Sequence, residues 1–264
     1  MRFDYFPGCT LKNRAKELDE YAHRCADALG VTLQEIENWQ CCGGAFTSDP
    51  AEVATKLSSV RLLREAEKSS KTLVTVCSAC YNVVKQTAHA METDPEFANR
   101  VDCYMADEGK YNGGVRVCHY LELLRDDIGF DKLSEKTVNP LKGKRIAPYY
   151  GCLLLRPSSV LRLDDPENPA VMEDMIRAVG GEPVYFGRRN ECCGGYVFAE
   201  SESLAKRAAT AIWQNAVAQG ADMMITACPL CMYNLKKSGC PIPVLYFTEL
   251  LAEALGVKEE QDEQ

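Results

Sequence analysis

The chain carries the same five-cysteine pattern twice. Each copy has a single cysteine, then a double cysteine inside Cys-Cys-Gly-Gly, then a Cys-x-x-Cys pair. In both copies 34 residues separate the double cysteine from the pair. Between the single cysteine and the double cysteine there are 31 residues in the first copy and 39 in the second. The first set is Cys9, Cys41, Cys42, Cys77 and Cys80, and the second is Cys152, Cys192, Cys193, Cys228 and Cys231. Thiols gathered in fives indicate a metal or a redox chemistry.

The repetition extends beyond the cysteines and divides the chain in two. The segment Leu73–Lys85 is similar to Met223–Lys236. We therefore expect a first repeat over residues 1–134, a linker over 135–143, and a second repeat over 144–264 that ends in an acidic tail. The first half holds extra residues around 93–114, rich in Asp, Glu, Asn and Gly, which we interpret as a loop insertion.

Strand-like and helix-like segments alternate in each half. The short β-rich run Arg2–Phe6 and the strand-like segments Leu73–Val76 and Met223–Thr226 each lead into a cysteine. This alternation predicts an α/β fold of two pseudo-twofold-related Rossmann-like repeats with mostly parallel sheets. Ligands of such sheets gather beyond the carboxyl ends of the strands. We therefore expect both cysteine sets at strand–helix turns, close together where the halves meet.

Length, charge and hydropathy narrow the class of protein. A chain of 264 residues that is 46% hydrophobic can bury a full core, and a net charge of −8 argues against a nucleic-acid partner. No apolar run approaches the roughly 20 residues that span a bilayer, and the N-terminal segment lacks the apolar region of a signal peptide. We therefore expect a cytoplasmic protein with no membrane span, in a reducing compartment where structural disulfides are rare.

Four kinds of chemistry could use these thiols. A disulfide scaffold fits poorly with a reducing compartment and with an odd number of cysteines in each half. A redox dithiol in each Cys-x-x-Cys leaves three cysteines of each set unexplained, and a zinc site leaves one. We favour an iron–sulfur cluster in each half, because clusters are held by cysteine thiolates. Five cysteines in each set indicate something other than an ordinary cubane with four cysteine ligands.

The duplicated pattern, with glycine after each double cysteine, resembles the cysteine-rich CCG domain of the B-type subunits of heterodisulfide reductases. The resemblance extends from Arg2 to about Gly256. It implies that each set holds one noncubane [4Fe-4S] cluster, and no ligand position is substituted. The family often has proline after the first double cysteine, whereas this chain has Gly43.

The same resemblance implies a function. It is that of the disulfide-reducing subunit of a heterodisulfide reductase-like electron-transfer complex, which splits a small-molecule disulfide between the two clusters. The sequence has no GxGxxG motif, so electrons would come from another subunit. The resemblance implies that this is a ferredoxin-like iron–sulfur subunit and, through it, a flavin-bearing subunit. The alternative is a non-catalytic iron–sulfur electron-relay subunit of a dehydrogenase or quinone-linked oxidoreductase. No side chain beyond the cluster ligands is assigned a catalytic role.

Four cysteines belong to neither set: Cys25, Cys103, Cys118 and Cys240. We expect each of them to behave as a small buried hydrophobic residue. His119 follows Cys118 at a predicted helix start, and a role near the clusters stays open for it.

Overall fold

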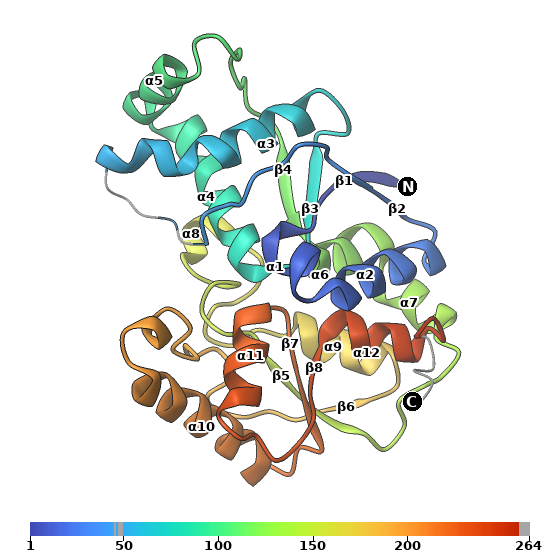
Figure 1. The fold of residues 1–264 in the computed structure, drawn as a ribbon. Helices are drawn as coiled ribbons and strands as arrows, with labels where there is room; N and C mark the ends of the chain where they lie inside the picture. Colours follow the sequence, from blue (N-terminus) through green and yellow to red (C-terminus); the bar gives the residue numbers. More distant parts are fainter. Residues whose placement is uncertain (45, 47–49, 259–264) are drawn as a thin grey trace.

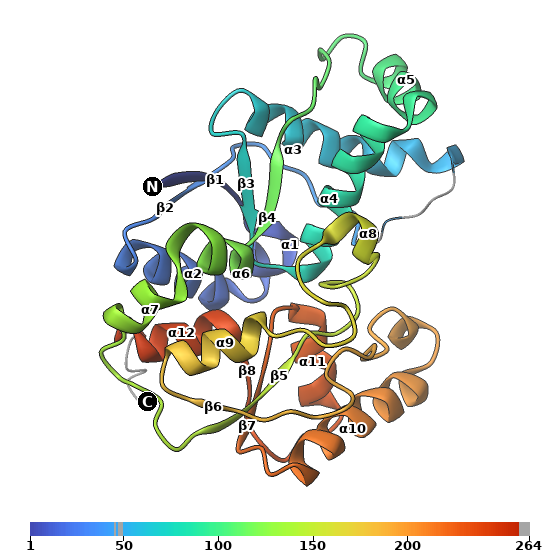
Figure 2. The same ribbon diagram turned by 180° about the vertical axis from the view of Figure 1, so that it is seen from behind.

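The two halves of the chain repeat one α/β arrangement in the computed structural model, which describes residues 1–44, 46 and 50–258 (Figures 1 and 2). Each half contains a four-stranded sheet whose neighbouring strands are all parallel. The strand orders β2-β1-β3-β4 and β6-β5-β7-β8 are the same topology. The predicted fold class is confirmed, and the sheets are fully rather than mostly parallel.

The strands are short. They are β1 (Arg2–Phe6), β2 (Thr32–Glu35), β3 (Thr72–Thr75), β4 (Arg116–His119), β5 (Arg145–Tyr149), β6 (Glu182–Pro183), β7 (Met223–Thr226) and β8 (Val244–Tyr246). The last residue of β6, Pro183, has no N–H to donate, which suits the edge position that this strand occupies.

Helices follow most of the strands. In the first half they are α1 (Gly8–Asn13), α2 (Lys16–Ala28), α3 (Leu57–Glu67), α4 (Ser78–Thr93), α5 (Pro95–Tyr104), α6 (Tyr120–Glu122) and α7 (Phe130–Lys136), with a 3-10 segment η1 (Pro50–Lys56) and a π-helical segment η2 (Leu123–Ile128). In the second half they are α8 (Ser158–Leu161), α9 (Val171–Ala178), α10 (Glu202–Ala218), α11 (Pro229–Lys237) and α12 (Phe247–Ala254), with a 3-10 segment η3 (Val197–Ala199).

The extra segment of the first half is not only a loop, because it contains α5. The Asp94 carboxylate accepts the N–H groups of Glu96 (3.1 Å) and Phe97 (3.0 Å), and Pro95 occupies the first turn. An aspartate cap followed by proline is a strong helix start. This local signal outweighs the polar composition on which the loop prediction was based.

The expected linker begins inside a helix. α7 extends to Lys136, so residues 135 and 136 are helical. Its Leu133 is fully buried and anchors the helix to the core. Residues 137–144 form neither helix nor strand. The division into repeats over 1–134 and 144–264 stays a prediction, and the acidic tail over 259–264 lies outside the described residues.

The halves meet at the carboxyl ends of their central strands. Ser78, directly after Cys77, donates from its N–H (3.0 Å) and its hydroxyl (2.8 Å) to the carbonyl of Ala227. The buried hydroxyl of Tyr246 lies 2.7 Å from the Val76 carbonyl oxygen and 2.9 Å from that of Ala227. α2 packs against α12 across the same junction (Figure 1). The carboxyl edges of the two sheets therefore face each other.

Replacing Tyr246 by Phe should weaken this junction. The buried Val76 carbonyl would lose this hydroxyl donor, whereas the Ala227 carbonyl would keep the donors of Ser78, so we expect the free energy of unfolding to fall by roughly 1–3 kcal/mol. Urea unfolding of the two proteins measures the change. Tyr104→Phe is the control, since Tyr104 is 61% exposed and its substitution should leave the unfolding midpoint in place. An unchanged midpoint for Tyr246→Phe would show that the hydroxyl does not stabilise the junction.

Candidate functional site

Both cysteine sets lie at the facing edges of the sheets. Cys9 is in the first turn of α1, directly after β1, and Cys77 stands between β3 and α4. Cys152 and Cys228 follow β5 and β7 in the same way. The double cysteines reach these edges from the irregular segments that follow β2 and β6. Each strand–helix turn therefore directs a thiol toward the junction.

The structure brings thiols of the first set together in pairs. The sulfurs of Cys41 and Cys9 are 3.5 Å apart, and those of Cys42 and Cys80 are also 3.5 Å apart. A hydrogen bond joins Cys80 to Cys77. Three of these side chains are buried, whereas Cys9 and Cys41 are exposed. The set thus has a protected side and a side that is open to solvent.

The second set has the same arrangement. The sulfurs of Cys193 and Cys231 are 3.4 Å apart, Cys231 is hydrogen-bonded to Cys228, and Cys152 is hydrogen-bonded to Cys192. Cys192 is the exposed member and Cys152 is partly exposed. The thiol contacts of the two repeats therefore correspond pair by pair.

Glycines leave the space that the sulfurs occupy. A Cβ on Gly8 would lie 2.6 Å from the Cys80 sulfur, and a Cβ on Gly151 would lie 3.2 Å from the Cys231 sulfur. Both glycines have positive φ angles, which other residues rarely adopt. The glycine before the first cysteine of each set thus allows the last cysteine of that set to approach the backbone.

The Cys-Cys-Gly-Gly turns depend on glycine for the same reasons. Gly43 has a φ of 85°, which proline cannot adopt, so this turn requires a residue other than proline. In the second repeat, a Cβ on Gly194 would lie 2.8 Å from the Ala205 Cα, and one on Gly195 would lie 2.6 Å from the Leu230 side chain. The second turn is therefore held tightly between α10 and α11.

Hydrogen bonds favour the thiolate form at one cysteine of each double cysteine. The Cys80 thiol, followed by the Gly44 N–H, lowers the pKa of Cys42. The pKa of Cys192 is lowered by the Cys152 thiol and then by the N–H groups of the glycines that follow Cys193. Thiolates are the form in which cysteine binds metals. The favoured thiolates are therefore Cys42 in the first set and Cys192 in the second, while neighbouring thiols raise the pKa values of Cys80, Cys152 and Cys231.

The donor set fits an iron–sulfur cluster. Its ligand atoms are all thiol sulfurs, they approach one another within 3.4–3.5 Å, and the glycine contacts leave room for no larger side chain among them. All fourteen cysteines lie in the described residues, and each is a free thiol. Within that part of the chain, no three His, Cys, Asp or Glu side chains converge as they would around one metal ion.

Sequence reasoning missed Tyr196, which lies between the two sets. Its hydroxyl donates to the carbonyl of Gly44 in the first repeat. Burial raises the pKa of Tyr196, and thiols of both sets, led by Cys228 and Cys77, act in the same direction. With Ser78 and the second set, Tyr196 lines a small cavity of about 20 Å³. The one available signal was that Tyr196 follows the second Cys-Cys-Gly-Gly where alanine follows the first.

The other cysteines and His119 have mainly packing roles. Cys25 and Cys118 are buried, as predicted, whereas Cys240 is partly exposed. The prediction is wrong for Cys103, which is exposed because α5 buries only Val101. His119 is fully buried and caps α6 by accepting the N–H of Leu121 at 3.2 Å. Burial lowers its pKa to about 3, so its ring is neutral and stacks among aromatic side chains.

Comparison with known families accounts for the duplicated pattern. Two segments, residues 3–85 and 146–236, match CCG, a cysteine-rich domain. The chain belongs to the CCG cysteine-rich family. The two matched segments contain all ten cysteines of the two sets, one set in each segment. The resemblance inferred from the sequence is therefore confirmed, in duplicate.

Several curated relatives are similar over nearly their whole length. The 8-methylmenaquinol:fumarate reductase membrane anchor subunit of Wolinella succinogenes is 31% identical, over 97% of this chain and 92% of the relative. A protein of Archaeoglobus profundus, named for its likeness to the B-type subunit of heterodisulfide reductase, is 27% identical, over 99% of this chain and 93% of the relative. The B-type subunit of a CoB-CoM heterodisulfide reductase of Methanosarcina acetivorans is 26% identical, over 98% of this chain and 91% of the relative.

The fold also has a solved counterpart. A hypothetical protein from Helicobacter pylori superimposes with a TM-score of 0.75 at 13% identity, over 99% of this chain and 50% of that one. This likeness supports the fold alone. Among the described residues, no helix has both the length and the apolar character needed to cross a bilayer.

Replacing Gly8 by Ala should disturb the first set specifically. The new methyl group would meet the Cys80 sulfur, so we expect less iron to be bound after anaerobic purification, as measured by iron and sulfide analysis. Gly143→Ala is the matched control, because Gly143 also has a positive φ but its Cβ would meet nothing within 4 Å. Both variants carry a backbone cost of roughly 1–2 kcal/mol. Equal iron contents in the two variants would show that the first set does not need the space that Gly8 leaves for the Cys80 sulfur.

Proposed function

We propose that this chain is the disulfide-reducing iron–sulfur subunit of a multi-subunit reductase complex. Each cysteine set would hold one noncubane [4Fe-4S] cluster, with Cys9, Cys41, Cys42, Cys77 and Cys80 as ligands of the first and Cys152, Cys192, Cys193, Cys228 and Cys231 as ligands of the second. The observation that carries the proposal is the direct contact between the two Cys-x-x-Cys turns, through Ser78 and Ala227.

Disulfide reduction explains why two complete sets would be held together. Splitting RS–SR into two thiols consumes two electrons and two protons, and bound iron–sulfur clusters would supply the electrons one at a time. The chain's own part is to hold both sets at a fixed separation through Ser78 and Tyr246. A further N–H, that of Ala79 in the first repeat, donates to the sulfur of Cys228 in the second.

The names of the relatives support partner subunits. Those from Archaeoglobus profundus and Methanosarcina acetivorans carry heterodisulfide reductase in their names, and both names refer to one subunit of that enzyme. We propose that electrons reach this chain from a ferredoxin-like iron–sulfur subunit and, through it, from a flavin-bearing subunit. We also propose that the complex is cytoplasmic.

A second candidate function is an electron relay without a substrate of its own. It is favoured by the relative from Wolinella succinogenes, which is named a membrane anchor subunit of a fumarate reductase. In that case the two sets would pass electrons between other subunits, for example in a quinone-linked oxidoreductase. The relay needs both sets but no substrate between them.

A reduction assay separates these functions. With reduced benzyl viologen as donor and CoM–CoB heterodisulfide as acceptor, the anaerobic protein should oxidise the dye. Cys80→Ala and Cys231→Ala should each abolish the reaction, and the double variant should be no worse, because the two sets act as a unit. Full activity in either single variant would refute the two-set mechanism. A wild-type protein that is loaded with iron but inactive with disulfides would favour the relay.

The number of clusters is tested by spectroscopy. We expect iron and acid-labile sulfide in near-equal amounts, with little zinc, in protein that was never exposed to oxygen. Cys192→Ser should disturb one electron paramagnetic resonance signal, and Cys41→Ser should disturb the other, because the two residues belong to separate sets. Loss of both signals in either variant would indicate one shared site, and excess zinc would exclude clusters.

A further inference from the structure

The two sets contain the same ligands, but their surroundings differ at one position of the helix that follows each Cys-x-x-Cys. At that position the second repeat has a side-chain amide that contacts its set, and the first repeat has no amide. Asn234 lies three residues after Cys231, within α11. At the same distance after Cys80 the first repeat has Val83, which carries no donor and is fully buried. The surroundings of the two sets therefore differ at this position of the helix that follows each Cys-x-x-Cys.

The amide of Asn234 is directed at Cys193. Its Nδ2 lies 3.2 Å from the Cys193 carbonyl oxygen and 3.7 Å from the Cys193 sulfur. The carbonyl oxygen fixes which end of the amide faces the cysteine, because only the NH₂ group can donate to it. The reversed orientation would place two acceptor oxygens against each other. The N–H groups of Asn234 therefore point toward a proposed cluster ligand.

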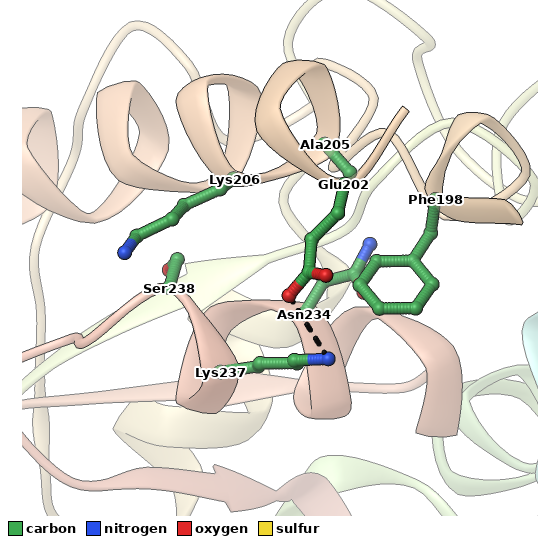
Figure 3. A pocket seen from close by; sticks show the side chains of 7 residues that line it. All are labelled: Phe198, Glu202, Ala205, Lys206, Asn234, Lys237 and Ser238. Atoms are coloured by element: carbon green, nitrogen blue, oxygen red, sulfur yellow. Dashed lines mark ion pairs between the residues drawn. The ribbon is translucent and has the colours of Figure 1, made fainter. Parts of the chain in front are cut away.

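Water does not compete strongly for this contact. Asn234 is 4% exposed and Cys193 is 3% exposed. On its other side, Asn234 lines a surface pocket with Phe198, Glu202 and Lys237 (Figure 3). This pocket measures about 10 Å³, which is at the lower limit for a single water molecule. Asn234 thus separates the second set from solvent while it donates to that set.

We propose that Asn234 raises the reduction potential of the cluster held by the second set and has no such effect on the first. Reduction adds negative charge that spreads onto the thiolate sulfurs, and a nearby N–H stabilises that charge. Hydrogen bonds to the sulfurs are one of the determinants of cluster potential. The low polarity of the buried site strengthens the effect. The inference rests on the proposed function, since it requires that the second set holds a cluster.

The test is an anaerobic redox titration of the full-length, cluster-loaded protein, followed by electron paramagnetic resonance. Asn234→Val gives the second repeat the residue that the first repeat has. We expect the equilibrium constant for reducing one cluster to fall by roughly tenfold, or about 59 mV for one electron, with the other cluster unchanged. Cys41→Ser and Cys192→Ser identify which signal belongs to which set.

Two further variants make the result decisive. Tyr233→Phe alters the neighbouring, half-exposed side chain on α11 and should leave both potentials unchanged. Asn234→Asp keeps the shape of the amide but has no N–H when ionised, so it should lower the same potential even if Asn234→Val does not load iron. Unchanged potentials in an iron-loaded Asn234 variant would overturn this inference alone. A wild-type protein without clusters would overturn the proposed function, and this inference with it.

Discussion

The hydrogen bonds of Ser78 to the Ala227 carbonyl and of Tyr246 to the Val76 carbonyl set the geometry on which the site depends. In each repeat a Cys-x-x-Cys turn follows a central parallel strand, so the turn lies at the carboxyl edge of its sheet. One repeat alone would expose this edge to water. Because the two edges are pressed together, Cys77 and Cys228 are buried, although both stand in turns. Interior-like surroundings for the thiols are therefore a property of the pair of repeats.

The sequence predicts the elements best where local signals are strong. The strands Arg2–Phe6 and Met223–Thr226 are found with the predicted bounds, because both are short runs rich in residues that favour strands. The sequence fails at α5, where composition suggested a loop and the cap at Asp94 decided otherwise. Its error at Cys103 follows from the same cause, since an inserted surface helix has little core to enter.

The candidate site divides in the same way. The grouping of thiols into two fives could be predicted, because spacing within a duplicated motif is a linear property. The contacts of Gly8 with Cys80, of Tyr196 with Gly44 and of Asn234 with Cys193 could not. Each joins residues about 40 or more positions apart, and nothing in the local sequence records such distances. The contacts of Tyr196 and Asn234 also make the two repeats unequal, although their ligands are the same.

The uneven exposure of the thiols has a consequence for how the protein is assembled. Cys9, Cys41 and Cys192 reach solvent, while six of the other seven motif cysteines are buried. If iron and sulfide reach a chain whose sheets have already formed, these exposed thiols are the ones that a carrier can contact. The same opening makes the unloaded protein sensitive to air, because the exposed sulfurs of Cys9 and Cys41 lie only 3.5 Å apart. Cluster loading and oxidative damage would then both begin at the exposed motif cysteines.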